Sequence, residues 1–120
     1  MQRRSSTSVV IKSIDREAVR KAVEAYAAEL RASCPEVERV IWFGSWINGL
    51  PRPGSDVDLC LILSSAADQP RDRISRYLPK HSFPVGIDLF PYTRDEFERL
   101  GQDSPKWYAT ITSGLEFRLD

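Results

Sequence analysis

The chain has 120 residues, of which 42% are hydrophobic and 28% are charged, as in an ordinary soluble domain. Basic and acidic residues both number 17, so a formal net charge of zero gives no electrostatic reason to expect a nucleic acid or an anionic membrane as partner. No apolar run is long enough to span a membrane, no signal peptide is recognisable, and the two cysteines lack zinc-ligand spacing. We therefore expect a cytoplasmic protein.

The elements predicted along the chain alternate between helices and strands. Residues 1–12 indicate a flexible N-terminal arm with a short extended piece, and residues 13–120 indicate a single domain. Apolar periodicity, β-branched runs and capping or breaking residues predict eight elements in the order helix, strand, strand, helix, strand, helix, helix, strand. Their approximate bounds are 13–33, 37–43, 57–63, 71–78, 84–92, 94–100, 104–113 and 115–119. This order favours an α/β or α+β fold, in which helices pack on a small mixed sheet.

Two acids open the second predicted strand, in the sequence SDVDLCLIL. Side chains two apart on a strand point the same way, so Asp56 and Asp58 are expected on one face. Two close carboxylates repel each other and are costly to bury, whereas a divalent cation removes both problems. Magnesium prefers one or two carboxylates, with substrate phosphate and water as its other ligands. Taken alone, the pair is also consistent with a surface turn that starts a strand.

A glycine-serine turn, Gly44-Ser45, lies between the first predicted strand and a possible helical turn at residues 46–50. Glycine allows close backbone approach, and backbone N–H groups at a helix start attract anions. The Ser45 hydroxyl is able to contact a phosphate or to cap the helix. A phosphate site and a metal pair are thus expected on neighbouring strands.

A third acid, Asp88, lies inside the predicted strand VGIDLF, flanked by apolar residues. Burial of an unpaired carboxylate is expensive, so this position needs an explanation. If this strand lies beside residues 57–63, then Asp88 joins Asp56 and Asp58 around the metals. The alternative is a buried acid that pairs with an arginine.

Together these motifs resemble the nucleotidyltransferase superfamily that shares the DNA polymerase β palm fold. Gly44-Ser45, ten intervening residues, and then Asp56-x-Asp58 follow that superfamily's signature, with Asp88 as the later strand aspartate. The resemblance covers residues 37–92 and is closest to the minimal stand-alone members, the MNT domains. These are found as antitoxins beside helical HEPN toxins.

The resemblance implies a Mg²⁺-dependent transfer of a nucleoside monophosphate, AMP from ATP, to an acceptor hydroxyl. Asp56, Asp58 and Asp88 would bind the two metals, with Asp88 also helping to deprotonate the acceptor. Gly44 and Ser45, together with Ser55 and Arg52, would contact the nucleotide. The expected acceptor is a tyrosine of a HEPN partner, since the chain is too short for a large substrate domain.

One position departs from the family pattern. Many members have an arginine just before the glycine that follows the Gly-Ser turn, where this chain has Asn48 before Gly49. Arg52 is close enough in sequence to substitute for the missing cation. The departure leaves two alternatives open: a weak or inactive protein of the same fold that acts by binding its partner, or a small-molecule nucleotidyltransferase that forms a homo-oligomer.

Overall fold

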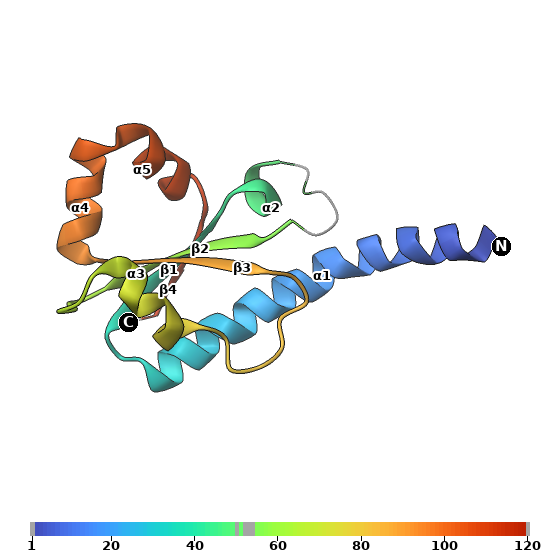
Figure 1. Ribbon diagram of the computed structural model, residues 1–120, viewed down its shortest axis with the longest axis horizontal. Helices are drawn as coiled ribbons and strands as arrows, with labels where there is room; N and C mark the ends of the chain where they lie inside the picture. The colour runs from blue at the N-terminus through green and yellow to red at the C-terminus, as the bar shows by residue number, and fades with distance from the viewer. Residues whose placement is uncertain (1, 50, 52–54, 120) are drawn as a thin grey trace.

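A mixed sheet of four strands, in the order β3-β2-β1-β4, forms the middle of the molecule (Figure 1). The computed structural model describes residues 2–49, 51 and 55–119, with side chains from residue 16 onward, so Arg52 lies outside the described residues. The strands of the described part are β1 (Val37–Phe43), β2 (Val57–Leu63), β3 (Ile87–Thr93) and β4 (Leu115–Arg118). Strand β1 pairs antiparallel with both β2 and β4, while β2 and β3 run parallel. The expected α/β class with a small mixed sheet is confirmed.

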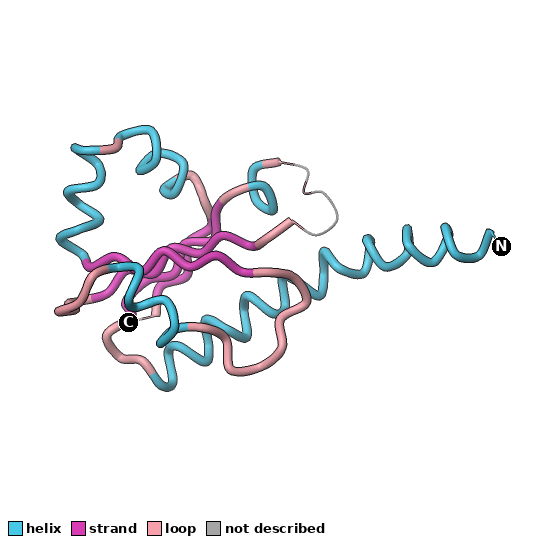
Figure 2. The backbone as a smooth tube through the Cα atoms, viewed as in Figure 1, coloured by secondary structure: helices cyan, strands magenta, loops and turns pink. Residues whose placement is uncertain are grey.

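The helices lie on both faces of this sheet (Figure 2). Their bounds are α1 (Gln2–Ser33), α2 (Ser45–Asn48), α3 (Pro70–Arg73), a 3₁₀ turn η1 (Ile74–Tyr77), α4 (Arg94–Asp103) and α5 (Pro105–Thr112). Helix α1 covers one face, and α4 and α5 cover part of the other. None of the described helices is long and apolar enough to cross a membrane.

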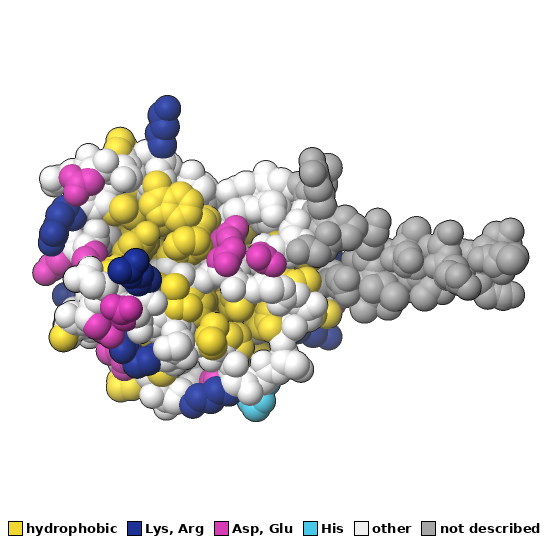
Figure 3. Space-filling model, in the orientation of Figure 1, with side chains coloured by type: hydrophobic (Ala, Val, Ile, Leu, Met, Phe, Trp, Pro, Cys, Tyr) yellow, Lys and Arg dark blue, Asp and Glu magenta, His cyan; other side chains and the backbone are white. Residues whose placement is uncertain are grey.

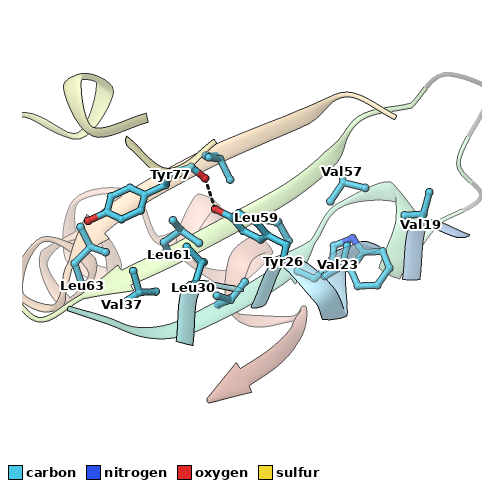
Figure 4. Close-up of a cluster of buried hydrophobic side chains, with 13 residues drawn as sticks. Val19, Val23, Tyr26, Leu30, Val37, Val57, Leu59, Leu61, Leu63 and Tyr77 are labelled. Carbon is cyan, nitrogen blue, oxygen red and sulfur yellow. Dashed lines mark hydrogen bonds between the residues drawn. The ribbon is translucent and has the colours of Figure 1, made fainter. Parts of the chain in front are cut away.

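The larger core lies between α1 and the sheet (Figure 4). Val19, Val23 and Leu30 recur on one side of α1 and pack against alternate residues of β2, such as Leu59 and Leu61. This arrangement follows from the two periods, 3.6 residues for a helix and two for a strand. The hydroxyl of Tyr26 donates a hydrogen bond of 2.6 Å to the backbone oxygen of Tyr77, which attaches α1 to the segment between β2 and β3.

The opposite face carries the other alternate residues of the strands. Ile41 and Phe43 of β1, with Cys60 and Ile62 of β2, pack against Phe97 of α4 and Ile111 of α5. Helix α4 begins with a complete capping box, in which Thr93 and Glu96 satisfy each other's backbone N–H groups. This second core reaches the acidic end of the sheet, because it contains Phe43, the register partner of Asp58.

Helix α1 is longer than the sequence predicted. It begins at Gln2, so the backbone over residues 2–12 is helical, and the short extended piece expected in this arm was wrong. An arm was expected because residues 1–12 are mostly polar and only briefly apolar, but polar residues continue a helix at low cost when no proline or glycine interrupts it. Whether this arm is flexible stays a prediction.

The helix predicted at residues 71–78 is also different. Only Pro70–Arg73 is α-helical, and a 3₁₀ turn follows it. The side chain of Arg73, at the end of α3, is fully buried. Its guanidinium donates to Asp68, to both carboxylate oxygens of Glu96 and to the backbone oxygen of Pro91. Arg73 therefore has a structural role in the connection between β2 and β3.

Candidate active site

Two aspartates lie side by side at one end of the sheet. In the parallel pairing of β2 with β3, Asp58 is the register partner of Asp88. On its other side Asp58 is opposite Phe43, the last residue of β1. The strand of Asp88 therefore lies beside residues 57–63, which was the condition for Asp88 to join Asp56 and Asp58.

The exposure of the three carboxylates differs from expectation. Asp58 is half-buried, whereas Asp56 and Asp88 are exposed. Asp88 was expected to be buried because apolar residues flank it, but β3 is an edge strand and its neighbours alternate between the two faces. No described arginine or lysine forms an ion pair with any of the three acids. The described residues thus offer no arginine to account for Asp88.

The electrostatics of Asp58 reflect this crowding. Partial burial raises the pKa of its carboxyl group above the usual value, and the neighbouring charges of Asp88 and then Asp56 raise it further. Burial and like charges both disfavour the ionised form. A bound cation would reverse the effect, because it favours the ionised form of every carboxylate around it.

Two glycines leave the space that the carboxylates occupy. Gly44 has φ 92°, and a Cβ built on it would overlap Oδ2 of Asp58 and lie 3.2 Å from its Cγ. A Cβ built on Gly86 would overlap Oδ1 of Asp56 and lie 2.9 Å from its Cγ. Gly44 thus brings the predicted phosphate turn against Asp58, and Gly86 brings the start of β3 against Asp56. Sequence reasoning missed Gly86, although a glycine just before a strand with an acid is a recognisable signal of close approach.

The turn after β1 is held in place by α2 and by the segment before β2. The oxygen of Gly44 accepts backbone hydrogen bonds from Ile47 and Asn48, which close the single turn of α2. The indole N–H of Trp46 donates to the backbone oxygen of Ser55 at 3.0 Å. Ser45 is exposed beside this turn. Of the residues predicted to contact phosphate, Gly44 lies against Asp58 and Ser45 follows it as the first residue of α2. The backbone oxygen of Ser55 accepts the hydrogen bond from Trp46 of α2.

Asn48 stands where the resemblance led us to expect an arginine, as in many members, and its side chain makes a defined contact in this structure. Its side-chain amide donates to the hydroxyl of Ser113 at 3.0 Å. Ser113 follows the last residue of α5, so this bond joins α2 to the C-terminal part of the domain. Position 48 therefore joins α2 to the end of α5 by a hydrogen bond and carries no positive charge.

The acids supply the carboxylate oxygens that magnesium prefers, but they do not supply all of the ligands that the ion needs. Among the residues that the structure describes, no group of three or more His, Cys, Asp or Glu side chains is arranged to hold a metal ion. Magnesium needs only one or two carboxylates when phosphate and water supply its remaining ligands. The pair Asp58 and Asp88 meets that requirement, and the assignment of all three acids to metal binding stays a prediction.

Comparisons with known proteins agree with this geometry. Residues 5–83 match the family described as "Poly(A) RNA polymerase, mitochondrial-like, central palm domain". The matched region includes Gly44, Ser45, Asp56 and Asp58 and ends before Asp88. No curated protein gave a significant match.

A solved structure from Sulfolobus solfataricus, described there as a candidate nucleotidyltransferase, shares the fold. It has a TM-score of 0.57 and 22% sequence identity, over 71% of this chain and 76% of that one. This likeness supports the palm-like arrangement of the sheet and helices. Because the family match covers more than half of the chain, this protein belongs to the mitochondrial-like poly(A) RNA polymerase central palm domain family, within the nucleotidyltransferase superfamily.

Proposed function

We propose that this protein is a magnesium-dependent nucleotidyltransferase that transfers a nucleoside monophosphate, AMP from ATP, to an acceptor hydroxyl. The observation that carries this proposal is the register pairing of Asp58 with Asp88, next to a glycine turn that contacts Asp58. The pair has no cationic partner among the described residues, and partial burial, followed by the neighbouring charge of Asp88, raises the pKa of Asp58. A palm-type fold with such a pair is suited to phosphoryl transfer.

Each residue has a proposed role. Asp56, Asp58 and Asp88 would hold Mg²⁺, which supplies positive charge that stabilises the attacking and leaving oxygens. The turn at Gly44, which lies against Asp58, would bring phosphate oxygens next to the metal-binding carboxylates, and the exposed Ser45 would donate its hydroxyl to them. Asp88, the exposed carboxylate at the edge of the sheet, accepts the proton of the acceptor hydroxyl.

The specific acceptor that we propose is a tyrosine of a helical HEPN toxin, which would make this protein the antitoxin of a cytoplasmic pair. The resemblance of the Gly-Ser and Asp-x-Asp motifs to MNT domains supports this assignment. The exposure of Asp88 supports a large acceptor, because the β3 side of the site is open to a second protein.

A second function is favoured by Asn48. The tether from Asn48 to Ser113 puts a neutral amide where many relatives have a phosphate-binding arginine. A protein with weak or no transfer activity would then act by binding its partner through the same fold.

The test is incubation with MgATP and the purified partner, followed by intact-mass measurement of both proteins. Wild type is expected to add one AMP, and Asp58→Asn and Asp88→Asn are expected to lose the transfer. Asp72→Asn is the matched control, because Asp72 is an exposed acid on α3, outside the carboxylate cluster. Unchanged transfer by Asp58→Asn would refute the carboxylate assignment. Neutralisation of the partner in cells by Asp58→Asn, with no transfer by wild type, would favour the binding function.

A further inference from the structure

The turn that follows α5 packs directly on the end of β1. Gly114 has no side chain, and a Cβ built on it would overlap the backbone oxygen of Trp42 and lie 2.9 Å from Cβ of Phe43. The N–H of Gly114 donates to the backbone oxygen of Ile111, which keeps the turn at the end of the helix. The chain from α5 to β4 therefore touches β1 at the two residues that precede Gly44.

The same turn contacts the chain again after Gly44. The side-chain amide of Asn48, the last residue of α2, donates to the hydroxyl of Ser113 at 3.0 Å. That hydroxyl in turn donates to the backbone oxygen of Thr110 at 2.8 Å, which holds it against the last turn of α5. The turn at Gly44 is therefore supported from the C-terminal part of the domain both before and after the glycine.

This support comes from a part of the chain that the family match does not reach. The match ends at residue 83, well before Ser113 and Gly114. Gly44 itself lies against Asp58, and the space-filling view shows acidic side chains next to the surface over α2 (Figure 3). A displacement of α2 would therefore move the turn at Gly44 relative to the carboxylates.

We infer that Asn48 and Ser113 are positioning residues, which hold the turn at Gly44 in the place where it binds the phosphates of the nucleoside triphosphate. This inference rests on the proposed function. Position 48 carries no cation that would meet a phosphate, so its neutral amide acts through α2 instead. Because the turn is fixed before the nucleotide arrives, less conformational freedom is lost when the phosphates bind.

A second contact keeps α2 on the domain when the first is removed. The indole N–H of Trp46 donates to the backbone oxygen of Ser55, at the start of β2. Loss of the hydrogen bond between Asn48 and Ser113 is therefore expected to loosen α2 without unfolding the domain. The effect is expected in phosphate binding more than in stability.

The test measures the Kd for MgATP and the inhibition constant of inorganic triphosphate, a competitor that carries the phosphates without the nucleoside. Ser113→Ala and Asn48→Ala are each expected to raise both constants by roughly fivefold, the effect of one lost hydrogen bond. Ser113→Thr keeps the hydroxyl and is expected to bind like wild type. Because the two residues act through one bond, the double variant is expected to be no weaker than either single variant.

The matched control is Thr112→Ala, which removes a hydroxyl one residue earlier. The hydroxyl of Thr112 donates within its own helix, to the backbone oxygens of Tyr108 and Ala109. Thr112→Ala is therefore expected to leave both constants within about twofold of wild type. Thermal unfolding checks that the variants are folded, and Asn48→Ala carries the test if Ser113→Ala does not fold.

An unchanged Kd for MgATP in Asn48→Ala overturns the inference, as does an equal loss of affinity in Thr112→Ala. Failure of triphosphate to compete with MgATP in wild type also overturns it, and so do additive losses in the double variant, which would show that the two residues act separately. These results leave the proposed function intact as long as wild type binds MgATP and Asp58→Asn transfers no nucleotide. Failure of wild type to bind MgATP would overturn both.

Discussion

Replacement of Gly44 by alanine tests the turn that contacts Asp58. Its φ of 92° is a conformation that residues with a side chain rarely adopt, and the added Cβ would overlap Oδ2 of Asp58. The left-handed backbone costs about 1–2 kcal/mol for alanine, and displacement of the carboxylate adds to that cost. We expect Gly44→Ala to lower the free energy of unfolding by about 2 kcal/mol and Tm by roughly 8 °C.

The control for this change is Gly49→Ala, on the other side of α2. Gly49 has φ −143°, which any residue adopts, and a Cβ there would meet its nearest atom, the backbone oxygen of Ser45, at 3.6 Å. We expect Gly49→Ala to change stability by less than about 0.5 kcal/mol. Urea denaturation followed by tryptophan fluorescence measures both variants.

A double-mutant cycle separates the two causes of the Gly44→Ala effect. In an Asp58→Ala background the overlap is gone and only the backbone strain remains, so Gly44→Ala is expected to cost about 1 kcal/mol less there. Equal stability of Gly44→Ala and Gly49→Ala would show that the turn does not hold the strained backbone. An unchanged cost in the Asp58→Ala background would show that Gly44 does not confine this carboxylate.

Three further changes probe the site and the connection that supports it. Gly86→Ala is expected to displace the carboxylate of Asp56 and to lower kcat/KM for nucleotide transfer by up to roughly 100-fold. An assay with labelled ATP measures this change, and an unchanged kcat/KM would contradict the expectation. Asp58→Asn is expected to raise stability at neutral pH, because the raised pKa makes the ionised Asp58 unfavourable in the folded state, and the gain should fade as acid protonates Asp58 in wild type. Urea titrations across pH test this sign, and a gain that grows in acid would contradict it. Arg73→Met is expected to cost about 3 kcal/mol in the free energy of unfolding, because it leaves Glu96 without its buried partner, and a loss below about 1 kcal/mol would contradict a structural role.

Most of the elements were predictable because their signals are local. The bounds of the first two strands agree with the structure, since residues 37–43 and 57–63 are rich in β-branched, aromatic and other apolar residues. The capping box at Thr93 was predictable for the same reason. The burial of Arg73 was not, because its partners Asp68 and Glu96 are brought together only by the fold.

The site was predictable in its residues but not in its arrangement. The motifs at Gly44 and Asp56 are short in sequence, whereas the pairing of Asp58 with Asp88 depends on the register of two strands separated by a long connection. Spacing along the chain does not fix that register. The hydrogen bond from Asn48 to Ser113 also depends on the fold, because the end of α5 reaches α2 only once the C-terminal helices fold over the sheet.

The contact between Arg73 and Pro91 has a consequence for the association of this protein with itself. Edge strands present unpaired backbone groups that recruit other strands and start aggregation. In β3, Pro91 has no backbone N–H, and its carbonyl oxygen already accepts a hydrogen bond of 2.9 Å from Arg73. Neither backbone group of this residue is available to an incoming strand. At Pro91, the edge that carries Asp88 therefore offers no backbone partner for sheet extension.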